Sequence, residues 1–310
     1  MINILVVIAP LFLIIFASAL LQRVKNVGDH WSSVLNEFAL KIGLPVLLFS
    51  SLSKSSFSFF EHAELLVSTS IFIFAILALI FVIGKILRLE KRVFRTLFLC
   101  SIFHNTAYLG IPVLTQVSGE EILPVATLIV AVYLFWTFTL GLGVLEYEQM
   151  SQQSHKIFLK IIRRLLKNPL LIAVVLGILI ASLGITLPAI VLKSLDMITA
   201  SVTPTVLIVI GLFIGKSKIG KLSDWLPVLL FSVVMLVIMP ALFYFGIQFS
   251  GFSPKLLFAS IIQTAMPLAI TPFALADEFG LNKGFIARSI VLSTLLSTIS
   301  LPFWISALIG

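Results

Sequence analysis

Ten apolar runs, each about as long as a bilayer is thick, follow one another along the 310-residue chain. Charged residues make up only 11% of the composition, against about 25% in soluble proteins, and 60% of the residues are hydrophobic. A soluble fold has too few polar residues to cover that much apolar surface, so lipid is the expected solvent. Because the runs are continuous rather than alternating, they predict membrane-spanning helices and not barrel strands.

The runs predict an all-α integral membrane protein with ten transmembrane helices. The first begins near Met1 without the basic segment and cleavage site of a signal peptide. The residues between the runs suffice only for short connections, so no soluble domain is expected. With about 20 residues per crossing, the spans lie at about 4–22, 34–53, 65–87, 96–117, 122–145, 168–184, 190–215, 223–247, 254–277 and 285–309.

Basic residues are concentrated in every second connection between spans. Positively charged loops stay in the cytoplasm, so the alternation predicts an inner (plasma) membrane protein with both termini on the non-cytoplasmic side. These loops account for the net charge of +8 without a nucleic-acid partner. The residues are Arg23, Lys25, Lys85, Arg88, Lys91, Arg92, Arg95, Lys156, Lys160, Arg163, Arg164, Lys167, Lys216, Lys218, Lys221, Lys283 and Arg288.

The longest connection, 149–167, combines basic and apolar residues at helical spacing. Its basic residues follow one side of the predicted helix, and apolar residues occupy the other. This pattern predicts a basic amphipathic helix on the cytoplasmic surface, attracted to anionic lipid, with a merely solvated positive loop as the alternative. The apolar residues are Ile157, Phe158, Ile161, Ile162 and Leu165.

Two sets of three prolines have nearly the same spacing in the two halves of the chain. Five spans per half is an odd number, so the repeats 1–148 and 168–310 would cross the membrane in opposite directions. Such inverted repeats are typical of transporters with a central substrate site. The prolines are Pro10, Pro45 and Pro112, separated by 35 and 67 residues, and Pro169, Pro204 and Pro272, separated by 35 and 68 residues.

Spans four and nine occupy corresponding positions in these repeats, and prolines interrupt both. A proline in a helix interior removes a backbone donor and clashes with the preceding turn. Pro112 and Pro272 each suit the start of a second half-helix. We therefore predict two broken helices that cross near the midplane and present free backbone amides to an anion. Proline kinks with only a packing role are the alternative.

The residues around both breaks resemble those of the auxin efflux carrier family. Asn105 to Pro112 is similar to its span-four motif, and Met266 to Ala274 is similar to its span-nine motif. The resemblance covers nearly the whole chain. It implies an elevator-type carrier of small organic anions, either auxin-like acids or mono- and dicarboxylates. Spans 1, 2, 6 and 7 would form a scaffold that joins a homodimer, and spans 3–5 and 8–10 a moving core.

Two features depart from the plant members of that family. His104 stands where those proteins tend to have proline, and the central connection is far shorter. Auxin itself is therefore a poor expectation for the substrate, and the chain resembles a bacterial-type, short-loop carrier.

The two breaks contain the predicted substrate site. Asn105 is the strongest candidate because its amide both donates and accepts hydrogen bonds, with a helix cap as the structural alternative. Threonines in membrane helices often bond their own preceding turn, and Tyr108 and Met266 are equally compatible with core packing. Gly110 favours close approach of the crossing backbones. The predicted substrate-binding residues are Asn105, Thr106, Tyr108, Gly110, Ile111, Pro112, Met266, Pro267, Thr271 and Pro272.

Four further residues are candidates for ion coupling or charge compensation. A buried histidine such as His104 is more often structural than a proton switch. Helix-to-helix hydrogen bonding is an equal alternative for Gln263 and Thr264. Lys41 lies four residues after Glu37. That spacing favours a paired lysine over a substrate contact.

None of the 13 acidic residues is expected near the centre of a span. Proton- and sodium-driven carriers usually need such a carboxylate. An anion leaving a cell that is negative inside gains about 2.3 kcal/mol per charge per 100 mV. Efflux driven by the membrane potential is therefore the predicted function, with ion-coupled uptake or, less favoured, a channel as alternatives. No enzyme, cofactor or metal site is predicted, because the four histidines and Cys100 are scattered.

Overall fold

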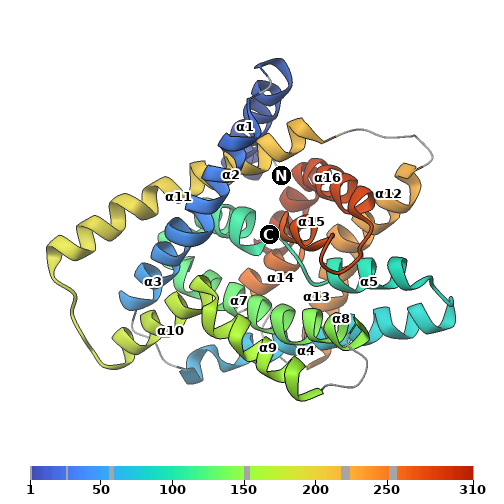
Figure 1. The fold of residues 1–310 in the computed structure, drawn as a ribbon. Helices are drawn as coiled ribbons and strands as arrows, with labels where there is room; N and C mark the ends of the chain where they lie inside the picture. The colour runs from blue at the N-terminus through green and yellow to red at the C-terminus, as the bar shows by residue number, and fades with distance from the viewer. Residues whose placement is uncertain are drawn as a thin grey trace.

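The computed structural model describes residues 2–25, 27–55, 59–149, 154–217, 224–250 and 257–309, and its regular elements there are helices (Figure 1). In lipid, a helix satisfies its own backbone hydrogen bonds, which is why the apolar runs take this form. The α-helices are α1 (Ile2–Lys25), α2 (Asp29–Phe38), α3 (Leu44–Ser53), α4 (Phe59–Ile86), α5 (Lys91–Cys100), α6 (Ile111–Ser118), α7 (Leu123–Trp136), α8 (Leu142–Gln149), α9 (Ser154–Lys167), α10 (Pro169–Ser182), α11 (Ala189–Lys216), α12 (Trp225–Val233), α13 (Met239–Ser250), α14 (Phe258–Thr264), α15 (Thr271–Leu275) and α16 (Lys283–Ile309).

Short turns of other helix types connect several of these helices. They are the π-helical turns η1 (Ala39–Gly43), η2 (Thr106–Gly110), η4 (Thr137–Gly141) and η6 (Val234–Ile238), and the 3₁₀ turn η3 (Glu120–Ile122). Some predictions fall outside the described residues: those for Lys218, Lys221, residues 150–153 of the central connection, and the starts of spans eight and nine at 223 and 254–256.

Seven stretches of the described residues are long and apolar enough to cross a membrane, or eight if α9 and α10 are counted as one bent span. The seven correspond to predicted spans one, two, three, five, seven, eight and ten. Span six is α10, which at 14 residues is too short to be counted alone. Spans four and nine are divided into short helices by their breaks. The all-helical membrane class is confirmed, whereas the count of ten and the inverted repeat stay predictions.

One group of helices contains the spans predicted as a scaffold. α1 packs along α11. α3 packs against both α10 and α11, and these three helices lie on the left of Figure 1. At Gly211 of α11 an added Cβ would lie 2.3 Å from the Ile15 carbonyl oxygen, and at Gly215 it would lie 2.4 Å from that of Ala19. Two glycines one turn apart thus let the two backbones touch. In lipid the hydrophobic effect does not bring helices together, so close packing at small residues stabilises their contact.

A second group contains the spans predicted as a moving core. α4 packs against α7, α12 against α16, and α13 against α14. The two groups meet where α3 contacts α7 and where α11 contacts η2. This packing agrees with a division into scaffold and core, which stays a prediction.

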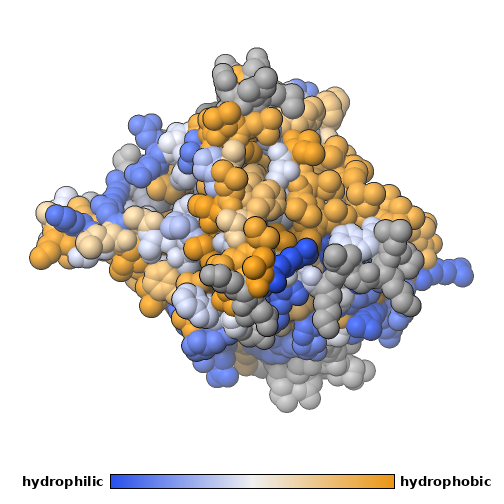
Figure 2. Space-filling model, turned by 90° about the horizontal axis from the view of Figure 1, so that it is seen from above, coloured by the Kyte–Doolittle hydropathy of each residue, from blue (hydrophilic) through white to orange (hydrophobic). Residues whose placement is uncertain are grey.

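Large apolar side chains cover much of the outer surface. Figure 2 shows wide hydrophobic areas on the face that it presents. Val6 and Leu13 of α1 and Leu226 of α12 are 67%, 66% and 63% exposed. Patches of this extent are unfavourable in water and suit a lipid environment.

The contact between α1 and α11 yields the first prediction. Replacing Gly211 by valine would force the two backbones apart, and overpacking of this kind costs about 1–3 kcal/mol. We expect Gly211→Val to lower the thermal unfolding midpoint of the purified protein in detergent. Gly246→Val in α13 is the matched control, because an added Cβ there meets no atom within 4 Å. Equal loss in both variants would contradict this packing.

Candidate functional site

Both proline-containing spans are broken, and the two breaks lie beside each other. In span four, α5 ends at Cys100 and helix resumes at η2; in span nine, α14 ends at Thr264 and helix resumes at α15. The non-helical segments between them are residues 101–105 and 265–270. Unwound backbone in a membrane needs hydrogen-bond partners from elsewhere in the protein.

The two non-helical segments supply those partners to each other. The Asn105 N–H donates to the Pro267 carbonyl oxygen at 2.8 Å, and the Ala269 N–H donates to the Phe103 carbonyl oxygen at 2.9 Å. The pair forms a short antiparallel bridge. The crossing of spans four and nine is therefore held by backbone hydrogen bonds.

Two side chains add to this bridge. The His104 Nδ1 lies 3.2 Å from the Met266 carbonyl oxygen, and because a carbonyl only accepts, Nδ1 carries the proton. The Leu268 N–H donates to the Ser293 hydroxyl of α16 at 3.1 Å. Buried polar backbone at the crossing is thus satisfied largely within the crossing itself.

The helices do not resume quite as the prolines predicted. Pro272 does lie in the first turn of α15, but α15 has only five residues and few aligned peptide dipoles. Pro112 likewise lies in the first turn of α6, but the π-helical turn η2 precedes α6, so helix resumes at Thr106 and not at the proline. The N–H groups of Asn105 and Thr106 are also occupied, the latter by the His104 carbonyl. Two of the amides next to the restart of span four are therefore not free to bind a ligand.

A cavity of about 130 Å³ lies at the crossing. The described residues that line it carry no charged side chain. Five parts of the chain contribute the polar ones: α2, the first break with η2, α15 after the second break, α7 and η4. Of the predicted site residues, the cavity collects His104, Asn105, Thr106, Tyr108 and Thr271.

Several polar atoms around this cavity have no hydrogen-bond partner in the described part of the chain. Asn105 occupies the cap position of η2, yet its side chain makes no capping bond. The His104 Nε2 and the Tyr133 hydroxyl are buried without a partner. Because Nδ1 of His104 carries the proton, Nε2 is an acceptor. Unpaired buried polar groups cost stability, so these atoms are candidate ligand contacts.

Gly110 and Gln263 contact each other beside the cavity rather than within its lining. A Cβ added at Gly110 would lie 2.0 Å from the Gln263 Oε1. Gln263 is fully buried, and both its amide atoms lack a partner among the described residues. The close approach expected at Gly110 is therefore to the Gln263 side chain of α14.

The remaining predicted residues do not line this cavity. Thr264 bonds its own helix, through its hydroxyl to the Ile261 carbonyl oxygen at 2.7 Å. Lys41 lies 3.2 Å from Glu37, with 68% of its side chain exposed, as the paired interpretation predicted. Ile111 lines a different cavity. The others are buried packing residues: Pro112, Met266, Pro267 and Pro272.

Three polar residues of the cavity were not predicted from the sequence: Asn36, Tyr133 and Thr137. The Tyr108 hydroxyl donates to the Asn36 Oδ1 at 2.8 Å, which ties η2 to α2. Asn36 could have been predicted, because an amide side chain is unusual inside an apolar run. Tyr133 and Thr137 could not, because single hydroxyl groups are common in membrane helices.

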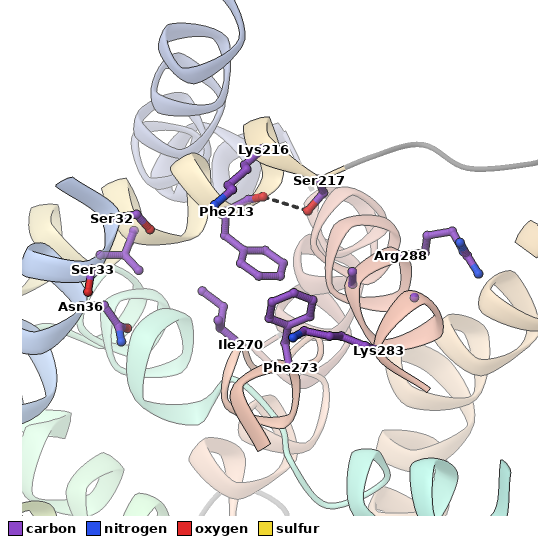
Figure 3. A pocket seen from close by; sticks show the side chains of 13 residues that line it. Ser32, Ser33, Asn36, Phe213, Lys216, Ser217, Ile270, Phe273, Lys283 and Arg288 are labelled. Atoms are coloured by element: carbon purple, nitrogen blue, oxygen red, sulfur yellow. Dashed lines mark hydrogen bonds between the residues drawn. The ribbon is translucent and has the colours of Figure 1, made fainter. Parts of the chain in front are cut away.

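A larger cavity of about 640 Å³ adjoins the crossing cavity and shares Asn36 and Ile270 with it (Figure 3). Its charged lining residues are all basic: Lys216, Lys283 and Arg288. Lys283 pairs with Asp277, and the Arg288 Nη1 lies 3.5 Å from Asp224.

Two aromatic rings that line this basic cavity contact each other. Phe213 of α11 and Phe273 of α15 have ring centroids 5.1 Å apart at an interplanar angle of 81° (Figure 3). The edge-to-face contact joins the predicted scaffold to the predicted core.

A third cavity, of about 710 Å³, lies toward the other end of α11. It is lined by Asp196 near the start of that helix, whereas Lys216 of the basic cavity is the last residue of the helix. Its other charged lining residues are Lys54, which pairs with Asp196, and Glu120 and Glu121. The crossing is therefore flanked by a basic cavity on one side and a mainly acidic one on the other.

Paired broken helices around a central polar cavity are the architecture of secondary transporters. A family model described as "Membrane transport protein" matches residues 3–305. The chain therefore belongs to this family of membrane transporters, the auxin efflux carrier family.

Its relatives are described as transporters. An uncharacterized transporter of Methanocaldococcus jannaschii is 26% identical, with 89% of each chain covered. A Rhizobium meliloti protein named "Putative malonate transporter" is 22% identical over 94% of this chain and 91% of its own. Auxin efflux carrier component 8 of Arabidopsis thaliana is 21% identical, with 89% of each covered.

The contact between Gly110 and Gln263 yields the second prediction. Gly110→Ala should lower the unfolding midpoint, because the buried Gln263 amide must move, at a cost of about 1–3 kcal/mol. In a Gln263→Ala background the same substitution should cost less than half as much, since the colliding atoms are gone. Thermal unfolding of the four proteins measures the coupling. An equal cost in both backgrounds would contradict the contact.

Proposed function

We propose that this transporter carries small organic anions of the mono- or dicarboxylate class through the cavity at the crossing of spans four and nine. The observation that carries the proposal is the set of unpartnered polar groups around that cavity, including the Asn105 amide and the Tyr133 hydroxyl. Both groups are uncharged and can donate hydrogen bonds to a carboxylate. Neutral donors bind an anion less tightly than a buried lysine would, so the anion can be released.

The size of the cavity favours a short acid. The cavity has a volume of about 130 Å³. Pockets for drug-sized ligands are larger, about 300–1,000 Å³. This favours an acid of malonate size over an indole acid, in line with the name of the Rhizobium relative and not that of the Arabidopsis one.

The charges of the two flanking cavities favour efflux. The positive-inside rule assigns the cavity with Lys216, Lys283 and Arg288 to the cytoplasmic side. There it would concentrate anions, whereas the acidic residues Glu120 and Glu121 would repel them at the opposite mouth. Membrane potential then drives the anion outward, without a coupling ion.

We further propose elevator-type alternating access, with the core sliding against the scaffold. The Tyr108–Asn36 hydrogen bond and the Phe213–Phe273 contact both join the two groups and would have to break in each cycle. The scaffold would also join a homodimer. Ion-coupled uptake is disfavoured because no carboxylate lines the crossing cavity among the described residues. A channel is disfavoured because paired broken helices around a central site are typical of carriers.

Ligand contact by Tyr133 yields the third prediction. Tyr133→Phe removes an unpartnered hydroxyl, so stability without ligand should be unchanged or higher. Carboxylate affinity should nevertheless fall about ten-fold, because a hydrogen bond to a charged group contributes about 1.5–3 kcal/mol. Thermal-shift titrations against a panel of carboxylates measure both effects.

Matched variants separate this effect from a general loss of structure. Tyr244→Phe on α13 is the control for Tyr133→Phe, and Gln116→Ala, an exposed amide on α6, is the control for Asn105→Ala. Both cavity variants should lose the carboxylate-induced shift while both controls retain it. A full shift in Asn105→Ala and Tyr133→Phe would exclude the crossing cavity as the binding site.

The driving force is the subject of the fourth prediction. In proteoliposomes, flux of the carboxylate that gives the largest thermal shift should saturate and follow an imposed potassium diffusion potential. Asn105→Ala should abolish it. Flux that follows only a proton or sodium gradient would contradict potential-driven efflux, and flux that rises linearly with concentration would indicate a channel.

A further inference from the structure

The amphipathic helix α9 has two faces with different partners. On its inner face, Ile161 packs over Gly143 of α8, where an added Cβ would lie 3.0 Å from the Ile161 Cδ1. Glu146 of α8 is 1% exposed, and the Arg164 Nη1 lies 2.5 Å from its Oε1. The Lys160 Nζ lies 3.2 Å from the same oxygen. The inner face therefore compensates a buried carboxylate.

The inner face also reaches the end of span nine. Arg164 pairs with Glu278, and its guanidinium lies over the ring of Phe279, 5.5 Å from the centroid. At its C-terminus α9 is followed, after the Asn168 cap, by α10. One helix thus contacts two spans of the predicted core and is continuous with a span of the predicted scaffold.

The outer face of α9 forms an open groove of about 550 Å³. Its apolar residues are three or four positions apart in the sequence, and so are its basic residues, so both kinds lie on the same side of the helix. Leu159 and Leu166 are 52% and 71% exposed, which the inner packing of α9 leaves unexplained. The residues that line the groove are Leu159, Ile162, Leu166, Arg163 and Lys167, together with Lys160, which also pairs with Glu146 and so lies at the border of the two faces.

The angle of α9 suits the membrane surface. α9 and α10 are bent by 66° relative to each other at Asn168. Where apolar α10 crosses the bilayer, α9 lies nearer to the membrane plane than to its normal. An amphipathic helix in that position meets headgroups and the first part of the acyl chains together.

We propose that this groove binds an anionic phospholipid of the cytoplasmic leaflet. Arg163 and Lys167 would bind its phosphate, and Leu159, Ile162 and Leu166 would contact an acyl chain. A free phosphate would leave the apolar half unused, and an acidic soluble peptide would have to compete with the membrane for that half. Bound lipid would join α9 to the membrane surface and so restrain the connection between core and scaffold. The proposal is independent of the substrate.

The test uses full-length protein in detergent, titrated with phosphatidylglycerol, phosphatidylcholine or inorganic phosphate while the thermal unfolding midpoint is followed. Phosphatidylglycerol alone should raise the midpoint. Arg163→Gln combined with Lys167→Gln should weaken its apparent affinity about twenty-five-fold, from about a fivefold contribution of each cation. Arg23→Gln combined with Lys91→Gln, two exposed cations elsewhere, is the charge-matched control and should leave the affinity unchanged.

A second variant tests the apolar half of the groove. Leu166→Ser changes an exposed side chain, so it should preserve stability without lipid and still weaken phosphatidylglycerol binding. The proposal is overturned if inorganic phosphate raises the midpoint as phosphatidylglycerol does, which would indicate a free anion. It is also overturned if the control pair loses as much affinity as the groove pair, or if Leu166→Ser has no effect on lipid binding.

Discussion

Backbone polar groups inside a membrane must find partners within the protein, and the hydrogen bonds between the two breaks meet that requirement here. Asn105 and Ala269 donate across the crossing to Pro267 and Phe103. Without this exchange, neither segment would be stable in an unwound form at that depth. The proline positions that would weaken a single helix become compatible with the fold because the two breaks occur together.

The same pairing determines what the site can do. The N–H groups of Asn105, Thr106, Leu268 and Ala269 have partners within the protein, and polar side chains from the breaks and their neighbouring helices line the cavity. Asn105 stands at a helix cap position without capping, and Tyr133 is buried without a partner. Leaving either side chain without a hydrogen bond lowers the stability of the fold, as expected of groups that bind a ligand. The uncharged lining of the crossing cavity favours release of a bound anion. The charged cavities on either side favour its movement through the crossing.

Much of this arrangement was accessible from sequence, because lipid imposes simple rules. Apolar runs and proline breaks predicted the helices and the two interrupted spans, and the motifs around Asn105 and Thr271 predicted five residues of the cavity. The point at which span four resumes was missed, since η2 is stabilised by tertiary packing that local propensity does not report. Tyr133 and Glu146 were also missed, because their roles depend on groups distant in the chain.

The central claim is that a carboxylate binds between the two paired breaks. An experimental structure of the protein saturated with the carboxylate that stabilises it most would test this directly. The account predicts ligand density in the crossing cavity, within hydrogen-bonding distance of the Asn105 amide and the Tyr133 hydroxyl. Density confined to the basic cavity near Lys216 and Arg288, with the crossing cavity empty, would contradict it.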